Sequence, residues 1–379
     1  MLVTKRLFEP VQLGSTRLPN RIGVAPMTRT SATDEGLVTD PMVSYYSKFA
    51  RGGFGLIITE GTYPDDQYSQ GYLNQPGICN DEQMQAWKRV VDSVHREGSN
   101  IFVQLMHAGA LSQGNRFKKE TLAPSPVQPK GEQMDMYGGQ GLFPVPREAS
   151  VEDIQGVIGG FTEAAKRAKQ AGFDGIELHG ANGYILDQFL TDYTNQRRDQ
   201  YGGSIENRVR LLVEVSRSVK EAVGDMTVGI RISQGKVNDF KHKWAGGEKD
   251  AEVIFSRLAE AGLDYLHVTE YEAWQPAFDN GDENQGAWEP AFGQRGASLA
   301  KLAGKYGEIP VMANGYLEDP QKANEMIEKG EADVVTIGRG ALANGDWPLK
   351  VKNNEPLTEF EPEKILSPNA KLKDFETPL

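Results

Sequence analysis

The segment LHGANGYILDQFL, at residues 178–190, places three hydrogen-bonding side chains within six residues, where an apolar run ends. They are His179, Asn182 and Tyr184. A neutral imidazole and an amide that converge on one carbonyl oxygen stabilise negative charge as it develops there. A phenol, with an ordinary pKa of about 10, carries a proton at neutral pH and can give it to a carbanion-like carbon. The set predicts a site that polarises a carbonyl group and delivers a proton, and it needs a cofactor to supply hydride.

The alternative for each of these residues is a buried side chain with a structural hydrogen bond, which is the usual role of an isolated His or Tyr. Three further polar residues at predicted strand ends favour a site instead: Thr28, Gln104 and Arg231. The amide and the hydroxyl can both donate and accept, as the edge of a heterocycle requires, although either could satisfy backbone groups. Arg231 needs an anionic partner at a barrel mouth, and Glu270 is the alternative partner, in a structural salt bridge.

Two glycine-bearing strand ends predict a phosphate site. They are Asn314-Gly315 and Gly338-Arg339-Gly340, after the seventh and eighth predicted strands. Backbone N–H groups at such turns point at a ligand, and glycine lets the ligand approach. The guanidinium of Arg339 adds a forked cation. The alternative is that both segments are only tight turns.

The predicted strand ends also exclude some chemistries. None ends in lysine, which argues against a Schiff-base aldolase. The histidines and glutamates are scattered and no His-x-His occurs, so we predict no metal site. No G-x-G-x-x-G follows a strand, which argues against an open dinucleotide-binding sheet.

The order of the elements predicts the fold that positions these residues. Eight short β-branched runs alternate with amphipathic helical stretches, such as residues 80–98, 204–224 and 320–330. Eight β–α units in order predict a parallel sheet closed into a (β/α)₈ TIM barrel, with an open doubly wound sheet as the alternative. The predicted strands are residues 22–26, 54–61, 100–107, 175–180, 227–233, 265–270, 309–315 and 332–339.

Three segments lie outside the units, and we treat residues 1–379 as one domain. Residues 7–20 predict a hairpin over the bottom of the barrel. Residues 108–150, rich in proline and glycine, predict a lid-like excursion over the site after the third strand. Residues 271–295 form a second long loop, after the sixth strand.

Composition narrows the partners and the compartment. Lys plus Arg is 41 and Asp plus Glu is 53, a net charge of −12, which argues against nucleic acid or an acidic membrane surface as a partner. The single cysteine, Cys79, cannot form an internal disulfide or a four-cysteine iron–sulfur site. No apolar run is long enough to span a membrane, and residues 1–10 lack a signal-peptide core. We expect a cytoplasmic protein, and leave open whether it is a homo-oligomer.

Nine segments in order along the chain resemble the old yellow enzyme family of FMN-dependent NADH:flavin oxidoreductases and ene-reductases. They are LFEPVQLGSTRLPNRI, APMTR, ITEGT, QLMHAG, HGANGYILDQFL, RRDQYGGSIENR, RIS, MANG and TIGRGALANGDWP. We interpret RRDQYGGSIENR as structural. Thr28 stands where one branch of the family has a cysteine, and Met106 where some members carry an aromatic residue. The larger relatives, with an iron–sulfur cluster and extra domains, do not fit one cysteine and 379 residues.

The resemblance implies a tightly bound, non-covalent FMN across the barrel mouth and NAD(P)H as the reductant. The isoalloxazine would contact Ala25, Pro26, Met27, Thr28, Gly61, Gln104 and Arg231, and the phosphate site would comprise Asn314, Gly315, Tyr316, Gly338 and Arg339. His179 and Asn182 would anchor the carbonyl oxygen of an enone or enal, and Tyr184 would protonate its α-carbon. NAD(P)H and the activated alkene would use one site in turn, with hydride passing through flavin N5. The alternatives are a nitroester reductase, an N-demethylating dehydrogenase, or a flavin- or phosphate-binding barrel without turnover.

Overall fold

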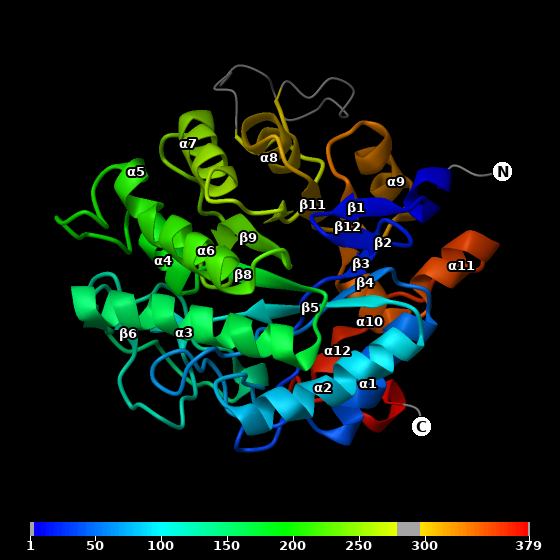
Figure 1. The fold of residues 1–379 in the computed structure, drawn as a ribbon, viewed down its shortest axis with the longest axis horizontal. Helices are drawn as coiled ribbons and strands as arrows, with labels where there is room; N and C mark the ends of the chain where they lie inside the picture. The colour runs from blue at the N-terminus through cyan, green and yellow to red at the C-terminus, as the bar shows by residue number, and fades with distance from the viewer. Residues whose placement is uncertain (1–3, 279–295, 378–379) are drawn as a thin grey trace.

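Eight parallel strands close into a barrel in the computed structural model, which describes residues 4–278 and 296–377. The predicted TIM barrel is therefore confirmed, and helices surround its strands (Figure 1). The last strand pairs with the first, through Thr336 and Gly23, and this pairing closes the sheet. The barrel strands are β3 Ile22–Val24, β4 Leu56–Ile58, β5 Asn100–Leu105, β8 Gly175–Asn182, β9 Thr227–Lys236, β10 Tyr265–Thr269, β11 Val311–Asn314 and β12 Val334–Ile337.

At least one helix follows each barrel strand, and side-chain caps fix several of the helix starts. Asn80 accepts from the backbone N–H of Gln83, and Asp319 accepts from two N–H groups of the first turn, which contains Pro320. The predicted helix over residues 204–224 is divided in two at Val209. The helices are α1 Asp40–Arg51, α2 Asp81–Arg96, α3 Val151–Ala171, α4 Ile185–Leu190, α5 Ile205–Arg208, α6 Arg210–Val223, α7 Glu248–Ala259, α8 Leu299–Gly307, α9 Pro320–Glu328, α10 Arg339–Ala343, α11 Trp347–Asn353 and α12 Pro362–Leu366.

A hairpin closes the bottom of the barrel, as predicted. It consists of β1 Val11–Leu13 and β2 Thr16–Leu18, which pair antiparallel. The hydroxyl of Thr16 donates to the carbonyl oxygen of Asp174, next to the amino end of β8. The hairpin leucines join one apolar cluster with side chains from inside the barrel: Leu13, Leu18, Leu56, Ile58, Phe102, Tyr265, Met312 and Val334.

The excursion after β5 carries short elements of its own. They are η2 Gly109–Leu111, β6 Leu122–Ala123, η3 Asp135–Tyr137 and β7 Arg147–Glu148. Arg197, from the RRDQYGG motif, donates to the carbonyl oxygens of Pro124 and Ala149 at the base of this excursion. The motif thus has the structural role that we expected. Of the long loop after β10, residues 279–295 lie outside the described residues.

The C-terminal segment packs against the loop that follows β3, a contact that the sequence did not predict. This segment follows α11 and includes α12 and η4 Asp374–Glu376. A further short helix, η1 Lys5–Phe8, precedes the hairpin at the other end of the chain. Arg29 forms a buried, bidentate ion pair with Glu376, with both N–O distances at 2.6 Å. The backbone N–H of Ala370 also donates to the carbonyl oxygen of Met136, in the excursion.

Candidate active site

A cavity opens at the carboxyl ends of the barrel strands, where the active site of this fold lies. It encloses about 990 Å³, part of which is open to solvent. Three residues that the sequence predicted for the site, Gly61, Gly315 and Tyr316, do not line this cavity. The predicted residues that do line it are Ala25, Pro26, Met27, Thr28, Gln104, His179, Asn182, Tyr184, Arg231, Asn314, Gly338 and Arg339.

His179, Asn182 and Tyr184 come together because β8 ends in a bulge. The pairing of β8 with β9 shifts register between Gly180 and Asn182, and such a bulge turns side chains toward the end of a strand. Asn182 has a φ of 62°, a left-handed conformation that asparagine tolerates better than most residues. Its N–H donates to the hydroxyl of Ser233, and its carbonyl oxygen accepts from the N–H of Val237. Two bonds to β9 and the loop after it thus fix the turn.

The electrostatic surroundings keep the donor pair and the phenol neutral. Burial, with the nearby Arg231, lowers the pKa of His179 to about 3, so the imidazole is uncharged at neutral pH. Its Nδ1 is buried and has no hydrogen-bond partner in the described residues. Burial raises the pKa of Tyr184 to about 12, and the hydroxyl of Tyr72 lies 2.6 Å from that of Tyr184. The site can therefore offer an uncharged ring nitrogen and a protonated phenol.

Tyr72 was not predicted. Its hydrogen bond lowers the pKa of Tyr184, as a donor to the phenol oxygen does, and raises that of Tyr72 itself. With Tyr72 as donor, the proton of Tyr184 is free to point elsewhere. The ring of Tyr72 also packs on Tyr137 of the excursion, with ring centroids 4.5 Å apart.

Arg231 is a buried cation with an amide partner. It is 5% exposed, and its Nη2 donates to the side-chain oxygen of Asn314 at 2.8 Å. Its Nε has no partner in the described part of the chain. Glu270, which we considered as its partner, instead forms an ion pair with Lys243. A buried guanidinium without a paired carboxylate fits an anionic ligand in the cavity.

Gln104 is oriented from below by a polar network inside the barrel. Its Nε2 donates to Glu177 at 2.8 Å, and the other carboxylate oxygen of Glu177 lies 2.7 Å from Nδ1 of His267. Nε2 of His267 in turn lies 2.9 Å from the hydroxyl of Thr336. Burial acts to raise the pKa of Glu177, but the interactions with His267, Arg231 and Gln104 outweigh it and lower this pKa. Burial lowers the pKa of His267. The carboxylate of Glu177 thus holds one N–H of the Gln104 amide.

The two predicted phosphate turns differ from each other. Gly315 has a φ of 137°, and a Cβ there would overlap the carbonyl oxygen of Glu270, so this turn requires glycine. After β12, Gly338 and Arg339 line the cavity. The guanidinium of Arg339 stacks 3.8 Å from the ring of Tyr316 and pairs with Glu318 at 2.7 Å. Arg339 therefore already has a carboxylate partner, which the sequence did not indicate.

Sequence reasoning missed the cavity residues that come from distant segments. Met134 and Tyr137 belong to the excursion, and Phe360 and Leu366 to the C-terminal segment. An aromatic residue inside a proline- and glycine-rich loop was an available signal for Tyr137, whereas Met134 had none. Gly61 lies just outside the cavity, where a Cβ would overlap the side chain of Met106.

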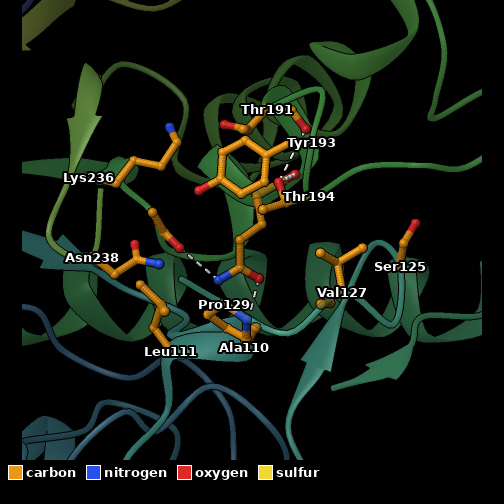
Figure 2. Close-up of a pocket in the computed structure, with 13 residues that line it drawn as sticks. Ala110, Leu111, Ser125, Val127, Pro129, Thr191, Tyr193, Thr194, Lys236 and Asn238 are labelled. Atoms are coloured by element: carbon orange, nitrogen blue, oxygen red, sulfur yellow. Dashed lines mark hydrogen bonds between the residues drawn. The ribbon is translucent and has the colours of Figure 1, made fainter. Parts of the chain in front are cut away.

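A second, much narrower cavity lies beside the turn, and Gly183 is part of its wall. Lys236 and Asn238, at the end of β9 and just after it, and Tyr193, after α4, belong to its wall (Figure 2). Lys236 forms a buried ion pair with Asp187, at 2.8 and 2.9 Å. Oδ2 of Asp187 also accepts the backbone N–H of Gly183 at 2.6 Å. This pair therefore supports the turn between Asn182 and Tyr184 from outside the main cavity.

Two searches of the described residues bear on other kinds of site. Neither residues 4–278 nor residues 296–377 contain a group of three or more His, Cys, Asp or Glu side chains that could hold a metal ion. No helix in the same ranges is long and apolar enough to cross a membrane.

The geometry defines a TIM barrel with a cavity at its mouth that contains a buried cation. The buried guanidinium of Arg231, whose Nε has no partner in the described residues, fits an anionic ligand such as FMN. Residues 6–358 match the model of the NADH:flavin oxidoreductase / NADH oxidase family. The chain belongs to this family, that of the old yellow enzymes, and is an FMN-dependent oxidoreductase with a nicotinamide reductant.

Known proteins resemble the chain over nearly all of its length. It is 34% identical to 12-oxophytodienoate reductase 7 of Oryza sativa subsp. japonica, over 96% of this chain and 92% of that protein. It is 36% identical to an NADH oxidase of Thermoanaerobacter brockii, over 91% of this chain and 50% of the oxidase, so it spans half the length of that relative. The solved old yellow enzyme homologue of Zymomonas mobilis superposes with a TM-score of 0.83 at 30% identity, covering 98% and 99% of the two chains.

Proposed function

We propose that the chain reduces the activated C=C bond of α,β-unsaturated carbonyl compounds, with NAD(P)H as the reductant and Tyr184 as the proton donor. One observation carries the proposal: a neutral histidine with an unpartnered Nδ1 lies beside a protonated phenol, with ring centroids 4.9 Å apart, in a cavity that also contains a buried cation. The 12-oxophytodienoate reductase among the relatives supports the substrate class.

The residues predicted for the site divide into three groups by role. Ala25 to Thr28, Gly61, Gln104 and Arg231 would hold the isoalloxazine. Asn314 to Tyr316, Gly338 and Arg339 would hold the phosphate. FMN, when bound, supplies to the alkene the hydride that it has received from NAD(P)H, so reductant and substrate use the cavity in turn.

The third group acts on the substrate. His179 and Asn182 hold the carbonyl oxygen and stabilise the negative charge that develops on it as hydride reaches the β-carbon. Tyr184 then gives its proton to the α-carbon. Its pKa of about 12 keeps that proton in place across the neutral range.

The test separates the two half-reactions in Tyr184→Phe. We expect the purified protein, wild type or variant, to be yellow. In Tyr184→Phe, rapid-mixing kinetics should show alkene reduction slowed by about 10²- to 10⁴-fold, the usual contribution of a proton donor. Reduction of bound FMN by NAD(P)H should change less than about threefold, because it needs no proton from Tyr184. Equal losses in both half-reactions would contradict the proposal.

Tyr201→Phe is the matched control. Tyr201 is also buried and loses one hydrogen bond, to Glu214, but it does not line the cavity. Product analysis with cyclohexenone, a nitroester and an N-methylated amine separates ene-reduction from the alternative flavin chemistries. Steady-state consumption of NAD(P)H with cyclohexenone excludes a barrel that only binds the cofactor.

A further inference from the structure

The loop after β3 is held in a strained conformation beside the cavity. Thr30 has a φ of 42°, in the left-handed region that a β-branched residue rarely adopts. Such a conformation costs about 1–3 kcal/mol and persists where the surroundings fix it. Thr28, two residues earlier, lines the cavity together with Tyr137 of the excursion. The strain thus lies directly behind a cavity residue.

One buried carboxylate holds this loop. Oε2 of Glu60 accepts the backbone N–H groups of Arg29 at 2.9 Å and Thr30 at 3.1 Å. Glu60 is 1% exposed and follows β4, which pairs with β3 in the barrel. Two N–H groups on one oxygen orient the peptide planes on both sides of Arg29. They therefore constrain the backbone that carries Thr28.

The rest of Glu60 is fixed as well. The hydroxyl of Tyr46 donates to Oε1 of Glu60 at 3.3 Å and accepts the backbone N–H of Glu60 at 3.0 Å. Burial raises the pKa of Glu60 to about 7, against the opposing effect of the hydrogen bonds from Arg29, Thr30 and Tyr46. Because burial of this carboxylate is unfavourable, Glu60 is better explained by its role in positioning the loop than by a contribution to stability.

The side chain of Arg29 anchors the same loop from the opposite direction. It pairs with Glu376 and donates from Nε to the carbonyl oxygen of Ala370 at 2.9 Å. The loop is therefore clamped between β4 and the C-terminal segment. Glu60 contributes the part of this clamp that acts on the backbone.

We propose that Glu60 is a positioning residue for Thr28: by holding the N–H groups of Arg29 and Thr30, it fixes the Thr28 hydroxyl in the wall of the cavity. This proposal rests on the proposed function, in which Thr28 contacts the isoalloxazine. Glu60 itself does not line the cavity, so its effect on the reaction passes through the loop that places Thr28 and Arg29 in the cavity wall.

A double-mutant cycle tests this coupling in the full-length, FMN-loaded protein. We expect Glu60→Ala and Thr28→Ala each to lower the rate of enone reduction about tenfold, because misplacing a group by a fraction of an ångström has effects of this size. The double variant should be no slower than Thr28→Ala alone, since Glu60 has nothing left to position. Losses that multiply to about a hundredfold would overturn the proposal.

Two further variants separate positioning from general damage. Glu60→Gln keeps an acceptor oxygen at the same distance and should recover most of the rate, whereas a rate as low as that of Glu60→Ala contradicts the proposal. Glu214→Ala, on α6, removes a carboxylate that accepts from Tyr201 outside the cavity and serves as the control. The dissociation constant and visible spectrum of bound FMN are measured over the same cycle. These two measurements do not depend on the substrate, so they report coupling between Glu60 and Thr28 even if enones are not reduced. Failure of the proposed function can therefore be distinguished from failure of the positioning role of Glu60.

Discussion

The two ends of the barrel are built on opposite principles. At the bottom, the leucines of the hairpin complete an apolar cluster with side chains from several strands. At the mouth, the structure buries charged and polar groups: Arg231, Glu60 and the pair of Asp187 with Lys236. Apolar burial stabilises wherever it occurs, whereas a buried charge is costly unless it is well paired. We infer that burial at the bottom of the barrel stabilises the fold. Burial of charged groups at the mouth lowers that stability, but it fixes the positions of the side chains in the site.

The largest expected effect comes from breaking the buried pair at the mouth. Asp187→Ala leaves the ammonium group of Lys236 buried and unpaired, and should lower the free energy of unfolding by about 3–5 kcal/mol. It also removes the acceptor for the N–H of Gly183, so enone reduction should fall even at temperatures where the variant is folded. Urea unfolding and single-turnover kinetics measure the two losses.

A second variant separates these two losses. Asp187→Leu combined with Lys236→Met removes both charges and the acceptor for the N–H of Gly183, and should regain most of the stability but not all of the activity. Full recovery of the activity would show that the pair has no part in shaping the turn between Asn182 and Tyr184.

Truncation of a side chain at the bottom of the barrel should affect stability alone. Leu18 is fully buried in the cluster beneath the barrel, and Leu18→Ala should lower the free energy of unfolding by about 3 kcal/mol through lost burial and the cavity left behind. Below the unfolding transition, both half-reactions should keep their rates within about twofold. A selective loss of alkene reduction would break the comparison, because it would link the bottom of the barrel to the donors at the mouth.

The contrast between the two ends also explains which features the sequence revealed. The barrel and its hairpin follow from the alternation of apolar runs and helical stretches, and the residues at 179, 182 and 184 from their spacing at one strand end. Pairs that are far apart in the chain left no such signal: Tyr72 meets Tyr184 across 112 positions, and Arg29 meets Glu376 across 347. These contacts depend on where long loops return to the barrel, which local patterns do not encode.

The last of these effects is a gain in stability at the mouth, and its size depends on pH. The pKa of Glu60 is about 7 in the folded protein, above the ordinary value near 4.3, so between these two values the folded state retains a proton that the unfolded state has released. Stability from this group is therefore lost as the pH rises from about 4.3 to 7, and above that range the ionised carboxylate carries a constant cost in stability. Glu60→Gln cannot ionise, so it should match the wild type at pH 4 and exceed it in thermal midpoint at pH 8.

Calorimetry of both proteins from pH 4 to pH 8 measures this difference, with Leu18→Ala as the reference whose deficit should not vary with pH. A rise in the midpoint for Glu60→Gln at high pH means that the wild type gives up stability to hold the loop behind Thr28. If the two midpoints differ by the same amount at every pH, Glu60 keeps one charge state throughout this range. Burial of its carboxylate then has no pH-dependent cost in stability, and the proposed difference between the mouth and the bottom of the barrel does not hold at this residue.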